Sequence, residues 1–356
     1  MTKRSLSAAK KNKEDEFYTQ LSDIENELKH YKEHFKGKVV LCNCDDPRVS
    51  NFFHYFSYNF EDFGLKKLIA TCYKSQERDL FSQNDSEKAI WLEYNGDKNG
   101  NRTPDVNEIG VKEFNGNGDF RSKECIELLK QADIVVTNPP FSLFREYVAQ
   151  LIEYDKKFLI IGNQNAITYQ EIFPLLKDNK VWLGYKFGDM GFRVPDYYAP
   201  RETRFWIDET GQKWRSMGNI CWFTNMDIAK RHENLILYKS YNEDEYPMYD
   251  NFDAINVNKV ADIPCDYNGV MGVPITFMDK FNPDQFEIVG LCSGVNDSKL
   301  LGIPVTWEKS SSHPYVNGKK AYARIFIRKK QPQQYSIEPP VSMVAEATVT
   351  LNDKKE

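Results

Sequence analysis

The amino-acid sequence predicts an α/β fold with a mostly parallel central sheet and a smaller C-terminal region. Short apolar runs rich in β-branched residues alternate with segments of helical spacing. Several runs are apolar on both faces, which is typical of parallel strands that helices cover on both sides. One run, "DIVVTNPPF", ends abruptly on an asparagine and two prolines. Because open α/β sheets bind ligands at the carboxyl ends of their strands, this end is a candidate site.

Six predicted strands follow one another along the chain. The helical segment "ECIELLKQA" precedes the third strand, and "YQEIFPLLKDN" follows the fourth. The third strand carries Asn138 directly after its last residue. The six strands span residues 38–42, 68–72, 133–137, 158–162, 181–185 and 220–224.

Changes in composition predict three parts. Residues 1–230 form the larger α/β domain, and residues of about 186–217 within it are dense in Gly, Pro, Arg and aromatics. A connection this long in a compact domain is usually functional or forms a small hairpin of its own. Residues 231–332 form a smaller region packed on the first, and residues 333–356 form a flexible tail.

Composition limits the class of protein. No apolar run is long enough to cross a bilayer, and the basic N-terminus lacks the apolar stretch of a signal peptide. We therefore expect no membrane association and a cytoplasmic location. Seven cysteines, an odd number, fit a reducing compartment. Cys42 and Cys44 are expected to be buried strand cysteines, and because the five histidines are dispersed no metal site is predicted.

The charge of the chain restricts how it can contact nucleic acid. A formal net charge of −5 argues against a surface coated in positive potential, so any such contact has to be local. Basic clusters occur at the N-terminus, between residues 201 and 215, and in "GKKAYARIFIRKK". Each cluster alone is more often a solvated face than a phosphate site.

The end of the third strand suits the recognition of an amino group. Asn138 offers an uncharged amide oxygen, and Pro139 and Pro140 hold the backbone extended, so the Pro139 carbonyl is left without a sheet partner. These two oxygens can accept both hydrogens of one exocyclic amine while Phe141 stacks on the ring that carries it. The alternative is a proline-terminated strand followed by an ordinary loop, because four letters match by chance.

Two acceptors on one amine have a chemical consequence. An aryl amine is a weak nucleophile because its lone pair is delocalised into the ring. Acceptors that hold both hydrogens draw the nitrogen towards sp³ geometry and concentrate the lone pair. This is electrostatic activation, and it requires no general base.

Longer motifs surround this tip in a recognisable order. They are "DEFYT", "LCNCDDPRVSNFFHYF", "GLKKLIATCY", "GDFRS", "TNPPFSLFREYV", "FLIIGNQNAITYQEIFP" and "GVPITFMDKFNPDQFEIVG". Together they resemble the EcoRI-type adenine-specific DNA methyltransferase family across roughly residues 12 to 330. The resemblance implies a Rossmann-like methyltransferase fold, S-adenosylmethionine as cofactor, and a site-specific adenine N6-methyltransferase that belongs to a restriction-modification or epigenetic system.

The resemblance also implies roles for individual residues. The N-terminal segment closes over the methionine part of the cofactor, the loop after the first strand lies by its ammonium, and "GDFRS" holds its adenine. That loop contains no glycine, and no acidic residue ends the second strand at Thr71 to Tyr73, so the ribose has no predicted partner. The implied cofactor residues are Phe17, Tyr18, Thr19, Asn43, Cys44, Asp45, Asp46, Asp119 and Phe120, and the implied catalytic residues are Asn138, Pro139, Pro140 and Phe141.

An adenine inside a duplex has to be rotated out before it can reach a strand tip. The insertion at about 186–217 is expected to face DNA, and residues 231–332 are expected to take part in recognition. The resemblance implies double-stranded DNA as partner, and a separately encoded restriction endonuclease is a candidate second partner whose existence the sequence does not decide. We expect a monomer, because one transfer needs one subunit. The candidate DNA contacts are Arg193, Tyr197, Arg201, Arg204, Lys319, Lys320 and Arg324.

Other functions remain open at this stage. An RNA-adenine or protein-glutamine methyltransferase of the same fold also uses an NPP-aromatic strand tip. Phe141 and the long C-terminal part favour adenine, because glutamine enzymes more often carry Tyr at that position. A relative that binds DNA but has lost catalysis is the alternative from another class. The intact NPPF motif argues against it.

Overall fold

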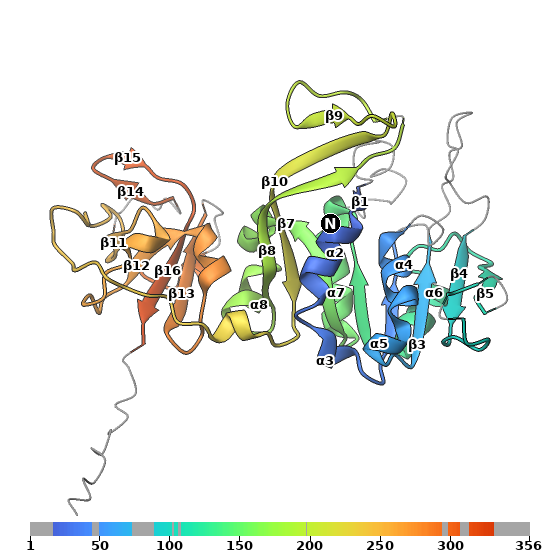
Figure 1. Ribbon diagram of the computed structural model, residues 1–356. Coiled ribbons are helices and arrows are strands. Elements are labelled where there is room, and N and C mark those ends of the chain that lie inside the picture. Colours follow the sequence, from blue (N-terminus) through green and yellow to red (C-terminus); the bar gives the residue numbers. More distant parts are fainter. Residues whose placement is uncertain are drawn as a thin grey trace, which may run out of the picture.

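Figure 1 shows the computed structural model, which describes residues 17–44, 50–72, 89–101, 103–105, 108–196, 198–293, 298–306 and 313–330. Two sheets dominate it. The larger sheet has the strand order β1-β8-β10-β7-β6-β2-β3-β4-β5, with β9 paired to β10. The smaller sheet has the order β11-β12-β16-β13.

Parallel strands form the centre of the large sheet. They are β2 (Val39–Cys42), β3 (Lys67–Thr71), β6 (Ile134–Thr137) and β7 (Lys157–Asn163). Antiparallel strands extend it on both sides. On one side lie β4 (Ile90–Tyr94) and β5 (Gly110–Glu113), and on the other β10 (Lys213–Thr224), β8 (Trp182–Arg193) and β1 (Tyr18–Thr19). All six predicted strands are present.

Helices cover both faces of this sheet, because alternate residues of each central strand point to opposite sides. Leu41, Val135 and Ile160 share one apolar cluster with α6 (Lys123–Gln131), α7 (Phe144–Glu153) and α8 (Phe173–Lys177). Their neighbours Val40, Val136 and Ile161 join a second cluster. That cluster contains α2 (Leu21–Leu28), α3 (Lys32–Phe35), α4 (Asn51–Tyr58) and α5 (Phe60–Phe63).

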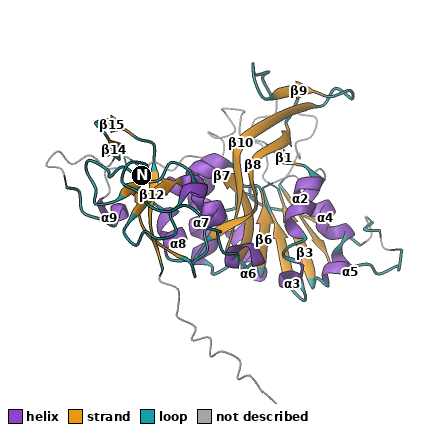
Figure 2. Cartoon of the chain, turned by 60° about the vertical axis from the view of Figure 1, so that its left-hand side comes forward, coloured by secondary structure: helices purple, strands orange, loops and turns teal. Residues whose placement is uncertain are grey.

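The predicted insertion is a long β-hairpin. β8 and β10 pair in the sheet and continue beyond it, where β9 (Phe205–Ile207) adds to β10. Figure 1 shows this extension projecting from the top of the sheet, and Figure 2 shows the same from a second side. We call residues 189–217 the arm.

The C-terminal region forms its own small sheet. It consists of β11 (Ile255–Asn256), β12 (Met271–Pro274), β16 (Arg324–Lys329) and β13 (Phe286–Cys292). One face shares the apolar cluster of α6, α7 and α8, and the other packs on Tyr249, Phe252 and the short α9 (Ser298–Leu301). A two-stranded hairpin, β14 (Tyr315–Val316) and β15 (Lys319–Lys320), projects beside it.

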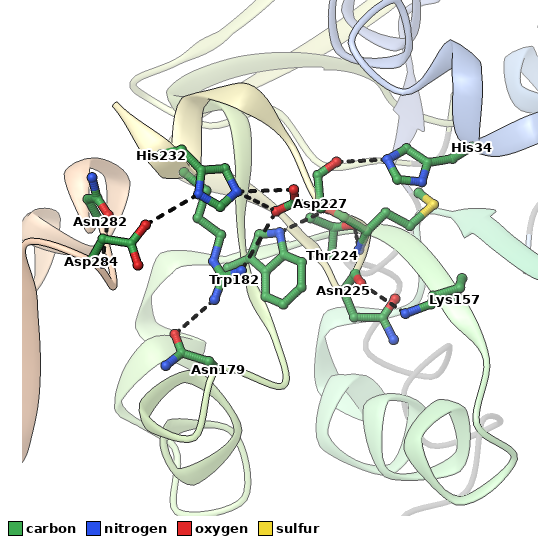
Figure 3. Close-up of polar contacts among 12 residues, drawn as sticks. His34, Lys157, Asn179, Trp182, Thr224, Asn225, Asp227, His232, Asn282 and Asp284 are labelled. Carbon is green, nitrogen blue, oxygen red and sulfur yellow. Dashed lines mark hydrogen bonds and ion pairs between the residues drawn. The ribbon is translucent and has the colours of Figure 1, made fainter. Parts of the chain in front are cut away.

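The structure also has short 3-10 helices at Phe141–Leu143, Gln164–Thr168, Ala229–His232, Val260–Asp262 and Ile275–Lys280. The one at Ala229–His232 follows β10 and joins the two sheets. Figure 3 shows the contacts here: the ring of His34 donates to the carbonyl of Asp227 across 2.7 Å, and Arg231 donates to Asn179 across 2.9 Å. His232 lies between Asp227 and Asp284 of the C-terminal region.

The α/β prediction is confirmed, with the difference that only the centre of the sheet is parallel. The boundary at residue 230 stays a prediction because both sheets share one apolar cluster. The predicted tail at 333–356 lies outside the described residues. Among the described residues no helix is long and apolar enough to span a membrane, and no group of His, Cys, Asp or Glu is arranged to hold a metal ion.

Candidate active site

The carboxyl ends of β2 and β6 meet at one edge of the sheet. The two strands are parallel neighbours, with Leu41 opposite Val135. Thr137, the last residue of β6, donates its hydroxyl to the carbonyl of Asn43, which follows β2. Tyr147 of α7 donates its hydroxyl to the side-chain oxygen of Asn43. Both oxygens of Asn43 are therefore held by neighbours, which positions the loop after β2 beside the tip of β6.

Burial keeps Tyr147 in this role. The side chain lies fully inside the protein, and burial raises the pKa of Tyr147 well above its usual value. The phenol therefore stays protonated and remains a hydrogen-bond donor at any physiological pH.

Asn138 at the tip is only 7% exposed. Its Nδ2 donates to the backbone carbonyl of Phe17 across 2.7 Å. Because a carbonyl can only accept, Nδ2 has to face Phe17, and the Oδ1 of Asn138 is turned to the other side. No described donor bonds this Oδ1 or the carbonyl of Pro139. The strand tip therefore holds an oriented amide acceptor next to an unused backbone acceptor.

Aromatic rings surround this acceptor pair. Phe141 begins the 3-10 turn after Pro140, and its ring stacks on Phe17 with centroids 5.8 Å apart and planes 21° apart. Phe17 in turn contacts Phe192 of β8 and Tyr198 of the arm. Phe17 therefore covers one face of Phe141, whose side chain remains partly exposed.

The N-terminal segment lies beside the strand tip, and its predicted contact with the cofactor stays a prediction. Tyr18 and Thr19 form β1, which pairs with Arg193 and Phe192 at the point where β8 leaves the sheet. The backbone carbonyl of Thr19 accepts from Asn51 across 2.7 Å. The Thr19 hydroxyl is buried and has no hydrogen-bond partner in the described part of the chain. A buried orphan hydroxyl beside a strand tip suits contact with a bound polar group.

The loop after β2 contains a strained residue. Cys44 has φ of 82°, in the left-handed region that glycine usually occupies. The turn that a glycine would normally make is thus made by a cysteine, which costs about 1–3 kcal/mol. Asp45 and Asp46, the predicted partners of the cofactor ammonium, lie outside the described residues.

The "GDFRS" segment abuts the end of β3. A Cβ on Gly118 would lie 2.3 Å from the carbonyl of Cys72, so only glycine allows this approach. Arg121 donates its Nε and Nη2 to the Asp119 carboxylate, across 3.0 and 2.7 Å, and its Nη1 to Glu146 across 2.9 Å. These hydrogen bonds, first of all to Asp119, raise the pKa of Arg121. Asp119 is therefore held rigidly, with accepting capacity left on Oδ2.

The ring of Phe120 is buried and does not form an exposed stacking surface. It is 6% exposed and packs edge-on against Tyr147, with centroids 5.1 Å apart. The guanidinium of Arg121 lies 5.3 Å from the centre of its ring. Any ring that packs on Phe120 shares it with Arg121.

The candidate DNA contacts differ in their surroundings. Arg193 lies 5.0 Å over the ring of Tyr18, and Arg204 pairs with Asp189 across 3.3 Å. Arg201 on the arm and Lys319 and Lys320 on β15 are exposed. Tyr197 lies outside the described residues.

The prediction of a DNA contact at Arg324 does not fit the structure. Arg324 is 9% exposed inside the C-terminal sheet. Its guanidinium donates to the side-chain oxygen of Asn256 and to the carbonyls of Tyr322 and Ala323. The sequence could not separate it from its exposed basic neighbours, because strand alternation in "YARIFIRKK" leaves either face a candidate for the core.

Four residues that sequence reasoning missed belong to the site: Thr137, Tyr147, Arg121 and Asn51. Tyr147 carries a signal that could have found it. It lies on the inward face of α7 with Phe144, Val148 and Leu151, directly after the strand tip. The sequence holds no such signal for Asn51 or Arg121. Asn51 contacts the distant backbone of Thr19, and Arg121 contacts Asp119 in its own turn.

A mixed α/β sheet whose strand tip carries two acceptors and an aromatic ring is the arrangement expected of an amino methyltransferase. The sequence matches the family described as "Adenine-specific methyltransferase EcoRI" over residues 5–330. The chain belongs to this family.

Curated relatives match along nearly the whole chain. The chain is 53% identical to Type II methyltransferase M.EcoRI of Escherichia coli, over 94% of this chain and 98% of the relative. It is 40% identical to M.MgeORF184P of Mycoplasma genitalium, over 91% and 98% of the two chains. It is 39% identical to M.MpnI of Mycoplasma pneumoniae, over 91% and 97%. Both are also named Type II methyltransferases.

These matches confirm the resemblance, and the chain is an adenine-specific DNA methyltransferase. A family match of this length favours this function over the RNA-adenine, protein-glutamine and inactive alternatives. A methyltransferase requires a methyl donor. The roles of the individual site residues stay predictions.

Proposed function

We propose that the chain transfers a methyl group from S-adenosylmethionine to the N6 amine of an adenine rotated out of duplex DNA. The orientation of Asn138 carries this proposal. Its Nδ2 is occupied by the Phe17 carbonyl, so its Oδ1 is turned away from Phe17, and the carbonyl of the next residue, Pro139, is a second acceptor. Two adjacent acceptors match the two hydrogens of one exocyclic amine.

The acceptor pair activates the amine electrostatically. Asn138 Oδ1 and the Pro139 carbonyl draw the two N–H bonds out of the ring plane, which concentrates the nitrogen lone pair. The uncovered face of Phe141 stacks on the adenine and sets its plane. Burial of Asn138 strengthens both hydrogen bonds, because a dry site screens them less.

The residues at this edge fit S-adenosylmethionine, which when bound supplies the activated methyl group. The orphan hydroxyl of Thr19 is available to a polar group of the cofactor. Asp119, fixed by Arg121, accepts an amine hydrogen on Oδ2. Asn43, held by Thr137 and Tyr147, shapes the backbone that faces the methionine part. Cys44, Tyr18, Phe17 and Phe120 line the same edge.

Duplex DNA is proposed to lie across the top of the molecule. The arm and the β14–β15 hairpin both rise on the side to which the carboxyl ends of the parallel strands point (Figures 1 and 2). Arg193, Arg201 and Arg204 on the arm and Lys319 and Lys320 on the hairpin supply positive charge for phosphates. The active edge lies at the base of the arm, where Phe17 contacts Phe192 and Tyr198.

The chain is proposed to act as a monomer in the cytoplasm, where the DNA of a bacterial cell is found. The relatives are named type II methyltransferases, which supports a role in restriction-modification with a separately encoded endonuclease. One flipped base and one strand tip suffice for each transfer, so one subunit completes the reaction.

The test is incubation of the purified chain with methyl-labelled S-adenosylmethionine and genomic DNA, followed by nucleoside analysis. We expect the label in N6-methyladenine. Asn138→Ala should lower the rate at least about a hundredfold, because it removes a preorganised acceptor. Cofactor affinity, measured by calorimetry, should change little. Asn95→Ala, an exposed asparagine at the opposite edge of the sheet, is the control and should stay at the wild-type rate.

Label in RNA or protein alone, or none with the wild-type chain, would overturn the proposal. An Asn138→Ala variant as active as the wild type would remove the strand tip from the mechanism and leave the substrate assignment standing.

A further inference from the structure

We propose that residues 17–20 act as a positioning strap that orients the catalytic amide of Asn138 and ties this orientation to the arm. The inference rests on the proposed function of Asn138, and it assigns a role to backbone and to side chains outside the acceptor pair. The carbonyl of Phe17 is the decisive group, since it accepts from Asn138 Nδ2 across 2.7 Å.

The physical reason lies in the symmetry of an amide. The oxygen and the NH2 group of asparagine are nearly equal in size, so a free Asn138 exchanges them by rotation about its last bond. Only one orientation presents an acceptor to the substrate amine. In the other orientation an N–H would face another N–H, which repels it. A fixed carbonyl at Phe17 selects the productive orientation.

The strap is held by three further contacts outside the strand tip. Asn51, the first residue of α4, donates to the carbonyl of Thr19 across 2.7 Å. Gln20 donates to the carbonyl of Gly191 across 2.9 Å. Backbone pairing joins Tyr18 and Thr19 to Arg193 and Phe192. The position of the Phe17 carbonyl therefore depends on α4 on one side and on β8 on the other.

The arm shares this anchorage. Gly191, Phe192 and Arg193 belong to β8 where it continues into the arm, and Arg193 lies over Tyr18. Phe17 also packs edge-on against Tyr198 of the arm. A displacement of the arm on binding DNA is therefore passed to the strap, and through the Phe17 carbonyl to Asn138. Asn51 and Gln20 are positioning residues, because they act on Asn138 only through the strap.

The first experiment measures the amide itself in the ligand-free protein. Asparagine-labelled protein is compared by NMR, with the Asn138 side-chain signals identified from their loss in Asn138→Ala. We expect slow hydrogen exchange of these NH2 protons in the wild type. Exchange should accelerate about three- to tenfold in Asn51→Ala and in Gln20→Ala, since each loses one hydrogen bond of the strap.

Asn59→Ala is the matched control. Asn59 follows the other end of α4 and donates its Nδ2 to the carbonyl of Tyr55 across 2.8 Å. The variant therefore loses a similar hydrogen bond from the same helix without contact to the strap. Its Asn138 exchange should stay at the wild-type rate even if its melting temperature falls.

The second experiment measures single-turnover methyl transfer at saturating cofactor and DNA. Asn51→Ala and Gln20→Ala should lose about three- to tenfold in this rate while their DNA affinity stays within about twofold. If the variants reach the wild-type rate at saturating cofactor and are slower only below saturation, the strap acts in cofactor binding and the proposal is overturned. Asn138 exchange equal in wild type and strap variants would also overturn it. Neither NMR result depends on the proposed activity, so the two proposals fail separately.

Discussion

At the scale of single residues, the site works by removing freedom from small polar groups. Asn138 is fixed by one carbonyl, and Asn43 is fixed by Thr137 and Tyr147. Asp119 is fixed by Arg121. Each of these contacts uses a donor or acceptor for orientation and leaves further hydrogen-bonding capacity for a ligand, which is how a preorganised polar site is built.

Cys44 allows a prediction at this scale. A β-branched side chain tolerates φ near 80° worse than cysteine does, so Cys44→Val should lower the free energy of unfolding by about 2 kcal/mol. Cys44→Gly relieves the strain but loosens the unfolded chain, and the two effects should cancel to within about 0.5 kcal/mol. Urea denaturation measures both variants. Cys265→Val, exposed and without positive φ, is the control and should be neutral. If Cys44→Val and Cys265→Val change the free energy of unfolding equally, the backbone at Cys44 is not strained.

At the scale of elements, the arm is the feature with the clearest separate role. Its end is a rigid turn, because Asp208 accepts from the ring nitrogen of Trp214 across 2.7 Å and from Thr210. These hydrogen bonds lower the pKa of Asp208 to about 2, first through Thr210 and then through Trp214. Trp206 stacks on Trp214 with planes 7° apart and remains 43% exposed. The arm therefore presents a flat, fixed apolar face.

We predict that this face contacts DNA. Trp206→Ala should raise the dissociation constant for duplex DNA about tenfold, because aromatic contacts with bases are worth about 1–3 kcal/mol. The loss should be nearly independent of salt, whereas Arg201→Ala should reduce the salt dependence. Fluorescence anisotropy at several salt concentrations separates the two. Tyr58→Ala removes an exposed aromatic ring from α4 and should bind as the wild type does. Unchanged binding by Trp206→Ala would exclude the arm end from the interface.

At the scale of the whole molecule, the two sheets are joined by partly buried polar contacts as well as by an apolar cluster. Lys230 donates to the carbonyls of Gly184 and Tyr185, each across 3.0 Å, and pairs with Asp279 across 2.5 Å. The side chains of this pair are only 14% and 16% exposed. Figure 3 shows the neighbouring contacts, in which His232 reaches Asp284.

Removing the Lys230 charge should loosen this junction. Lys230→Met leaves Asp279 without its partner across the junction, and we expect a loss of about 2–3 kcal/mol in the free energy of unfolding. Lys180→Met is the matched control. Its pair with Asp178 is exposed and 4.0 Å long, so the loss should stay below about 0.5 kcal/mol. Urea denaturation compares them, and equal losses would show that the Lys230–Asp279 pair does not join the two regions.

The sequence by itself determined which segments form the strands, which strand end is the candidate site, and the family. Apolar runs and the NPPF motif are local patterns, and such patterns can be recognised without knowledge of the fold. The sequence also shows that the loop after β2 lacks glycine. In the structure Cys44 adopts the left-handed conformation that a glycine would usually take there.

Only the tertiary structure decided which atoms meet at the tip. Phe17 and Asn138 are 121 positions apart, and Tyr147 reaches Asn43 over 104 positions, so no local pattern records either contact. Burial of Arg324 and exposure of Lys320 were equally undecidable from "KKAYARIF", because the face that a strand buries is chosen by the sheet packed against it. The residues of the strand tip are adjacent in sequence, whereas the orientation of their side chains depends on contacts with residues distant in sequence.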